Sequence, residues 1–325
     1  MNRPVRVRQV RRALHGVLLL DKPLGWTSND ALQKAKWLLR AEKAGHTGTL
    51  DPLATGLLPL CFGAATKFSQ VSLDADKAYR ATLGLGRRTS TGDLEGELLQ
   101  QRPVAVDRPM IEQVMQRLTG TIAQVPPMHS ALKKDGRALY EYARAGLEVE
   151  RAPRQVTIHA IDIIDWHDDM LVIDVSCSKG TYIRTLAEDI GEALGCGAHL
   201  TALRRTGSGP LGLDGAVTLA DLEAMDEPER LARLLPADAL LVDWPSLALD
   251  TSEAGRFLTG LRRRVIHPDA SAIKVYGPEP GAFLGSAHIT AGELIADRLL
   301  SPLEVRALIP AATAATTPQA LVAAA

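Results

Sequence analysis

The chain has 325 residues, which is more than one average domain holds, and its length predicts two domains. Hydrophobic residues make up 46% and charged residues 23%, the usual mixture of a globular protein. Lys and Arg number 37 against 38 Asp and Glu, giving a net charge of -1, which excludes a protein that coats nucleic acid by bulk charge.

The charge is distributed unevenly along the chain. Residues 1–90 hold 15 Lys and Arg against 6 Asp and Glu, a balance of +9 that the remainder offsets with -10. Residues 1–15 are predicted to form a basic N-terminal arm, because they contain five arginines and no acid. Such an arm is either a disordered segment that contacts phosphate or a solvated terminus without a role.

The composition also limits the cellular setting and the chemistry. The arm lacks the apolar stretch of a signal peptide, and no run of 18 apolar residues predicts a membrane span. The three cysteines, Cys61, Cys177 and Cys196, form no CxxC pair, so we expect buried free thiols in a cytoplasmic protein. The histidines are dispersed and lack the spacing of a zinc site.

The predicted elements, in chain order, mix strands with helices. Apolar or alternating patterns predict strands over 16–20, 57–62, 79–85, 156–165, 170–177, 272–276, 283–289 and 293–298. Helical periodicity predicts helices over 31–41 (with Ser28 as N-cap), 108–118, 139–147, 181–194, 219–225 and 252–261. The order lacks regular βα alternation, which favours an α+β fold with a mixed, largely antiparallel sheet flanked by helices.

An acidic, proline-containing stretch over residues 226–245 predicts a domain boundary near residue 245. The first domain then covers residues 16–245, and a small β-rich domain covers residues 246–310. Residues 311–325 are mostly Ala and Thr without apolar periodicity, which predicts a disordered Ala-rich tail.

One loop, residues 45–56, is rich in Gly and Thr and contains a single carboxylate, Asp51, followed by Pro52. Proline restricts the residue before it to extended conformations, so the loop can hold Asp51 at a fixed angle against an apolar wall. Partial desolvation would raise the reactivity of the carboxylate, provided that a cation keeps it ionised. The alternative is an ordinary Asp-Pro turn. The loop lacks the phosphate-binding patterns GxxxxGK[ST] and GxGxxG.

Two further segments combine aromatic and basic residues. Tyr182 and Arg184 lie at the predicted start of a helix, where the planar guanidinium suits a carboxylate; a surface arginine is the alternative. Tyr79 lies between Lys77 and Arg80, which suits base stacking; a core tyrosine is the alternative. The other arginine pairs and runs, at 87–88, 204–205 and 262–264, are expected to be solvated.

Taken together, these motifs closely resemble the bacterial TruB family of tRNA pseudouridine synthases. The matching segments are residues 16–23, 45–56, 77–79, 126–133 with 140–144, 177–184 and 203–205. They follow the family order and span most of the first domain. The second domain is similar to the family's small RNA-binding PUA-type module, although this match rests only on position and strand pattern.

The resemblance implies a pseudouridine synthase fold and conversion of uridine 55 to pseudouridine in the TΨC loop of tRNA. It implies no cofactor and no metal. The expected partner is the TΨC stem-loop of tRNA, with no membrane and no obligatory protein partner.

The resemblance also implies roles for single residues. Asp51 matches the catalytic aspartate, which attacks C1′ or C6 or acts partly as a base, and Arg184 matches the arginine that pairs with it. Asp93 matches a further acidic position of the family, with a structural turn as an equal alternative.

The substrate-binding positions follow in the same way. Tyr79 matches the tyrosine that stacks on the target base, and Tyr182 the one that lines the pocket near C5. His46 matches the histidine that enters the RNA loop, because the target base has to leave its stack to be reached. Leu203 matches a residue that contacts the flipped base, and Lys22 lies beside the pocket.

Two other functions fit parts of the pattern. A protein that folds or binds RNA without chemistry would use the same basic and aromatic residues. A hydrolase of glycosidic bonds would need a second carboxylate as general acid, and the sequence places none beside Asp51.

Overall fold

The structure is a computed structural model that describes residues 10–130 and 132–309, and the chain divides into two compact units between Leu235 and Pro236. Most of the basic arm and the Ala-rich tail from residue 311 lie outside the described residues. The division precedes the predicted boundary near residue 245 because residues 236–245 contact the second unit's sheet. There the backbone N–H of Lys274 donates to the Pro245 carbonyl over 2.8 Å.

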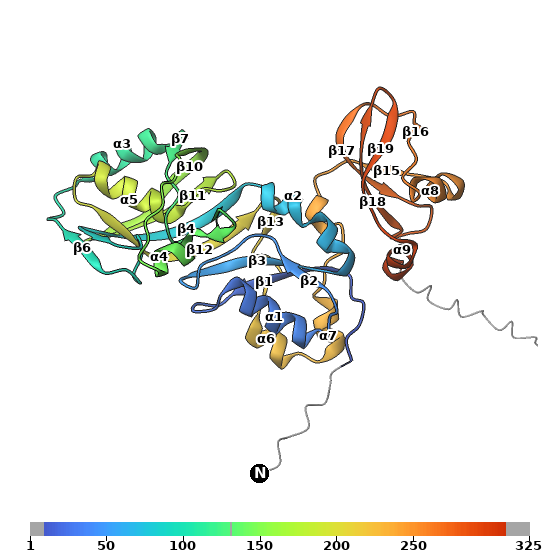
Figure 1. The fold of residues 1–325 in the computed structure, drawn as a ribbon, viewed down its shortest axis with the longest axis horizontal. Helices are drawn as coiled ribbons and strands as arrows, with labels where there is room; N and C mark the ends of the chain where they lie inside the picture. Colours follow the sequence, from blue (N-terminus) through green and yellow to red (C-terminus); the bar gives the residue numbers. More distant parts are fainter. Residues whose placement is uncertain (1–9, 131, 310–325) are drawn as a thin grey trace, which may run out of the picture. The chain divides into compact units, whose positions relative to one another are not determined.

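Within the described part of the first unit, ten strands form one mixed sheet (Figure 1). The order is β14-β1-β3-β12-β4-β11-β10-β7, with β2 paired to β3 and β13 to β12. The strands are β1 (Gly16–Lys22), β2 (Ala44–His46), β3 (Ala54–Phe62), β4 (Lys77–Leu85), β7 (Gly120–Gln124), β10 (Arg154–His167), β11 (Met170–Cys177), β12 (Ala198–Ser208), β13 (Leu211–Gly212) and β14 (Val217–Thr218). Only the pairs β1–β14 and β3–β12 are parallel, so the predicted mixed, largely antiparallel sheet is confirmed.

Helices and two small hairpins complete the described part of this unit. The helices are α1 (Ser28–Leu38), the short 3-10 helix η1 (Gly63–Phe68), α2 (Ser69–Asp74), α3 (Arg108–Leu118), α4 (Leu139–Arg144), α5 (Ile183–Ala193), α6 (Leu219–Ala224) and α7 (Glu227–Ala232); the hairpins pair β5 (Arg87–Thr89) with β6 (Leu98–Gln101) and β8 (Lys133–Lys134) with β9 (Arg137–Ala138). Helix α3 matches its predicted range, because the Asp107 side chain caps it by accepting the N–H of Met110 at 2.9 Å.

Two hydrophobic cores lie along the sheet. One packs β1 and β3 against α1 and α6; the other packs β4, β10, β11 and β12 against α3 and α5 (Figure 1). β1 is buried almost throughout, whereas β11 buries alternate residues from Leu171 to Cys177, as expected for a strand with one face on the core. Tyr79 on β4 and Leu203 on β12 contact both cores. These two residues therefore lie where the two halves of the sheet join.

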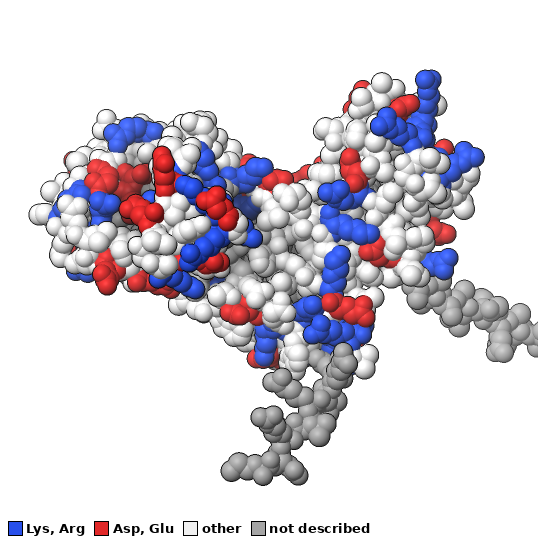
Figure 2. All heavy atoms as spheres, viewed as in Figure 1, with Lys and Arg blue, Asp and Glu red and all other residues white. Residues whose placement is uncertain are grey.

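The second unit contains a five-stranded sheet in the order β15-β17-β18-β19-β16. Its elements are the 3-10 helix η2 (Ala239–Leu241), β15 (Ser246–Ala248), α8 (Thr251–Phe257), β16 (Arg263–Arg264), β17 (Ala270–Tyr276), β18 (Phe283–Thr290), β19 (Glu293–Leu299) and α9 (Pro302–Leu308). The β-rich character predicted for this region is confirmed. On the face of the protein drawn in Figure 2, which includes both units, basic and acidic side chains are interspersed and do not form one basic surface. The net charge of the whole chain is -1.

Candidate active site

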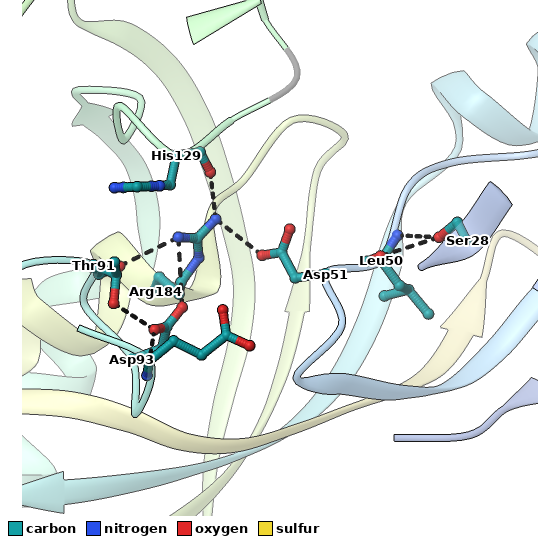
Figure 3. A network of polar contacts seen from close by, with 8 residues as sticks. Ser28, Leu50, Asp51, Thr91, Asp93, His129 and Arg184 are labelled. Atoms are coloured by element: carbon teal, nitrogen blue, oxygen red, sulfur yellow. Dashed lines mark hydrogen bonds and ion pairs between the residues drawn. The ribbon is translucent and has the colours of Figure 1, made fainter. Parts of the chain in front are cut away.

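Asp51 lies in the loop between β2 and β3, and the loop is held on both sides of it. The backbone N–H of Ala54 donates to the Asp51 carbonyl at 3.0 Å, which closes the turn that Asp-Pro predicts. Just before it, the buried hydroxyl of Ser28 accepts the N–H of Leu50 at 2.7 Å and donates to the Leu50 carbonyl at 3.1 Å (Figure 3). The backbone is thus anchored while the Asp51 side chain stays 47% exposed.

Arg184, in the first turn of α5, points its guanidinium at this carboxylate (Figure 3). Its Nη2 lies 2.9 Å from Oδ2 of Asp51 and donates to the His129 carbonyl over 2.6 Å. Its Nη1 donates to the Thr91 carbonyl over 3.2 Å. The side chain is only 7% exposed, so the alternative of a surface arginine is wrong.

Asp93 provides a second carboxylate on the other side of Arg184. Its Oδ2 lies 3.5 Å from Nη1 of Arg184, and both side chains are buried. Its Oδ1 accepts the Thr91 hydroxyl and the N–H of Glu95, while its backbone carbonyl accepts the Thr89 hydroxyl over 2.6 Å. The residue therefore both builds a turn and contacts the arginine.

The centre of the sheet, where β4 pairs with β12, carries three residues of interest: Tyr79, Leu203 and Arg205. Arg205 lies opposite Tyr79 in the β12–β4 register, and Leu203 lies opposite Ala81. Burial raises the pKa of Tyr79, and the Arg205 guanidinium opposes that shift. Arg205 is 1% exposed and donates through Nε to the Leu57 carbonyl over 2.6 Å, so the expectation of a solvated arginine was wrong here.

Two further titratable nitrogen groups of this region belong to Lys22 and His46. Lys22 is fully buried and donates to the carbonyls of Pro23, over 3.0 Å, and Trp26, over 2.6 Å. Burial lowers the pKa of Lys22 to about 8, and the nearby Asp51 carboxylate limits that fall. Burial and the charge of Arg205 also lower the pKa of His46, which favours a neutral imidazole. His46 ends β2, on the side of the loop that leads to Asp51.

Tyr182 is the N-cap residue of α5, two residues before Arg184. The guanidinium carbon of Arg154 lies 4.8 Å from the centre of its ring, a cation–π contact. The Tyr182 backbone is held by the Gln124 side chain, which accepts the Tyr182 N–H and donates to the Tyr182 carbonyl.

The structure thus gathers the residues that the motifs selected. Asp51 and Arg184 are in contact, Lys22 and Tyr79 are close enough for the Asp51 charge to affect their pKa values, and Tyr182 shares the helix start with Arg184. Motif analysis missed the carbonyls of Thr91 and His129, which have no side-chain signal. Arg205 was visible in the sequence, but nothing in its pattern revealed its burial.

Among residues 10–130 and 132–309, no three or more His, Cys, Asp or Glu side chains are grouped to hold a metal ion. In the same part of the chain, no helix is long and apolar enough to cross a membrane. All three cysteines are buried free thiols, as predicted.

Comparison with protein families and known structures gives a consistent result. The model of the TruB family pseudouridylate synthase N-terminal domain matches residues 36–183, and that of the tRNA pseudouridylate synthase B C-terminal domain matches residues 184–242. A tRNA pseudouridine synthase B of Verminephrobacter eiseniae is 58% identical over 94% of this chain and 94% of its own length. One of Cupriavidus pinatubonensis is 59% identical over 92% of this chain and 98% of its own.

Among solved structures, the crystal structure of a Cbf5-Nop10-Gar1 complex contains a chain that matches with a TM-score of 0.68 and 26% identity. The match covers 93% of this chain and 88% of that one. With more than half of its residues identical to these relatives over nearly its whole length, the chain belongs to the TruB family and is a tRNA pseudouridine synthase.

Proposed function

We propose that the enzyme isomerises uridine 55 in the TΨC loop of tRNA, with Asp51 as its catalytic carboxylate. The observation that carries this proposal is the pairing of an exposed Asp51 with a buried Arg184 at 2.9 Å. The carboxylate is accessible to a substrate, while the cation that stabilises it is fixed from behind.

The reaction rearranges bonds within one nucleotide. The N1–C1′ glycosidic bond breaks, the uracil turns, and a C5–C1′ bond forms. C5 then loses its proton to a base and N1 gains one, so no atoms are added or removed overall. Asp51 acts as a nucleophile at C1′ or at C6, or serves partly as the base that takes the C5 proton. Each of these roles needs an ionised carboxylate.

The neighbouring residues supply the binding surface for the extruded base. Tyr79 stacks on it at the centre of the sheet, Tyr182 lines the pocket near C5, and Leu203 contacts the base. Lys22 lies beside the pocket, and its interaction with Asp51 supports that place. His46 enters the RNA loop in place of the flipped uridine, since a protein that extracts a base needs a group to hold the gap open.

The second unit is proposed to act as a PUA-like RNA-binding domain. Its five-stranded sheet and the exposed side chains of Arg262 and Arg264 support this assignment. Arg263 between them is only 8% exposed and donates to the Glu253 carbonyl, so the expectation that the whole run is solvated is wrong at this residue. The buried free thiols of the chain are typical of a reducing compartment, which supports action in the cytoplasm.

The test of the catalytic assignment uses tRNA transcripts labelled with tritium at C5 of uridine. We expect Asp51→Asn to release no tritium while its dissociation constant for tRNA stays within about threefold of the unchanged protein, because the amide keeps the shape and loses the nucleophile. Asp162→Asn, an exposed carboxylate on β10, is the matched control and is expected to retain full activity. Turnover by Asp51→Asn would overturn the assignment.

Two further measurements test the position and the flipping. A transcript with cytidine at position 55 is expected to release no tritium, and release would refute the position. With 2-aminopurine beside the target uridine, binding to Asp51→Asn is expected to raise the fluorescence, because a flipped neighbour unstacks the probe. Unchanged fluorescence on saturation would argue against flipping.

A further inference from the structure

The helix that carries Arg184 begins without a cap of its own. Tyr182 is the N-cap residue of α5, and its phenol side chain makes no capping hydrogen bond. The first N–H groups of a helix have no partner within the helix, so a start of this kind needs one from elsewhere.

Gln124, the last residue of β7, provides that partner from a distant part of the chain. Its Oε1 accepts the N–H of Tyr182 at 2.8 Å, and its Nε2 donates to the Tyr182 carbonyl at 3.1 Å. Only one orientation of the amide satisfies both bonds. The side chain is 1% exposed, so water cannot replace it readily.

The strand next to Gln124 fixes the ring of the same tyrosine. Arg154 lies directly opposite Gln124 in the β7–β10 register, and its guanidinium packs on the Tyr182 ring at 4.8 Å. It also donates to the Gly180 carbonyl. The paired ends of β7 and β10 therefore hold both the backbone and the ring of Tyr182.

The chain that follows Gln124 reaches the arginine itself. The carbonyl of His129, five residues further on, accepts Nη2 of Arg184 at 2.6 Å. One segment thus contacts the turn from Tyr182 to Arg184 at its first residue and at its last.

We propose that Gln124 is a positioning residue for the reaction, which sets the turn that presents Tyr182 and Arg184 to Asp51. The inference rests on the proposed roles of those three residues. Gln124 touches no reacting atom; it acts through the two main-chain bonds, and loss of those bonds shifts the aromatic and the guanidinium together. Displacement of catalytic groups by about 1 Å costs on the order of a hundredfold in rate.

The first test is Gln124→Ala in single-turnover tritium release from labelled tRNA. We expect the rate constant at saturating enzyme to fall roughly 10- to 100-fold, with the tRNA dissociation constant within about threefold of the unchanged protein. The matched control is Gln155→Ala, an exposed glutamine on β10 next to Arg154, expected to leave the rate unchanged. A rate for Gln124→Ala within twofold of the unchanged protein would overturn the inference.

The second test keeps the volume of the side chain and remains informative if the alanine variant folds poorly. In Gln124→Glu the neutral acid offers the same donor and acceptor as the amide, whereas the ionised acid faces the Tyr182 carbonyl without a donor. A buried carboxyl titrates above its ordinary range. The rate relative to the unchanged protein is therefore expected to rise as the pH falls from about 8 to about 6.

A purely structural role would lower the fraction of active protein, which the rate constant at saturating enzyme does not register, and would give a rate ratio of about one at every pH. A flat ratio would therefore refute the positioning role. If the unchanged protein releases no tritium at all, the proposed function itself fails. If that protein is active and Gln124→Ala equals it, only this inference fails.

Discussion

The carboxylate of Asp51 and the guanidinium of Arg184 lie 2.9 Å apart, yet one side chain is 47% exposed and the other only 7%. The Arg184 guanidinium also donates to the carbonyls of Thr91 and His129 and forms an ion pair with the buried carboxylate of Asp93. The cation is therefore fixed before the substrate arrives, while Asp51 presents a free edge. Preorganised charge of this kind stabilises a developing charge without having to reorganise during the reaction.

Arg184→Lys tests whether the planar guanidinium matters beyond its charge. A single ammonium group cannot reach both carboxylates and both carbonyls at once. We expect the single-turnover rate to fall about a hundredfold, with tRNA binding within about threefold. Arg80→Lys is the control, because Arg80 forms an exposed two-bond pair with Asp174 that contributes little. A rate for Arg184→Lys close to that of Arg80→Lys would contradict this role of the guanidinium.

Asp93→Asn tests the carboxylate behind the arginine. The amide oxygen can still accept the Thr91 hydroxyl, but the buried guanidinium loses a negative partner at 3.5 Å. We expect the free energy of unfolding to fall by about 1–3 kcal/mol and the rate to fall about tenfold. Urea unfolding and tritium release measure the two effects. Glu97→Gln, exposed in the same loop, is the control, and identical behaviour of the two variants would disprove the coupling.

Much of the fold could be predicted because its elements carry strong local signals. The buried run of β1 and the alternation of β11 match their predicted ranges closely, as does α3 with its aspartate cap. β7 was missed because its one fully buried residue, Gln124, is polar, so hydrophobic periodicity gave no signal.

The site was less evident from local pattern alone. Asp51 and Arg184 were selected by motif, but their contact joins a loop to a helix start that is far away in the chain. Ser28 was predicted to cap α1; instead Thr27 caps it through the N–H of Asp30, and the Ser28 hydroxyl turns inward to Leu50. Serine is the better N-cap by intrinsic preference, so only the packed loop, which engages the Ser28 hydroxyl, leaves the cap to Thr27.

Ser28→Ala is expected to loosen the loop that carries Asp51. The substitution leaves the N–H and carbonyl of Leu50 without their partner in a buried place, which costs about 1–3 kcal/mol. We expect a lower thermal midpoint and a rate reduced several-fold at temperatures where the protein stays folded. Asn29→Ala changes the exposed neighbour and provides the control. A lower midpoint with an unchanged rate would mean that Ser28 stabilises the fold without positioning Asp51.

Lys22 is expected to make the free energy of unfolding increase with pH in the alkaline range. Burial lowers its pKa from 10.5 to about 8 in the folded protein, so between these values the unfolded chain binds more protons than the folded one. The contribution of this group to the free energy of unfolding therefore rises with pH across that interval. Below about pH 8 the lysine is charged in both states, and the free energy of unfolding is lowered by the full cost of burying the charge. Relative to Lys22→Met, the unchanged protein is expected to gain up to about 3 kcal/mol over the interval.

Urea unfolding of both proteins at a series of pH values measures this gain. Lys43→Met removes an exposed lysine and controls for the loss of one charge. Asp51→Asn sharpens the test: the Asp51 carboxylate raises the pKa of Lys22, so its removal is expected to move the rise to lower pH. A difference between the unchanged protein and Lys22→Met that stays constant from about pH 7 to about pH 10.5 would show that the lysine keeps its ordinary pKa. The bonds that the ammonium donates to the carbonyls of Pro23 and Trp26 would then compensate for the hydration that burial removes.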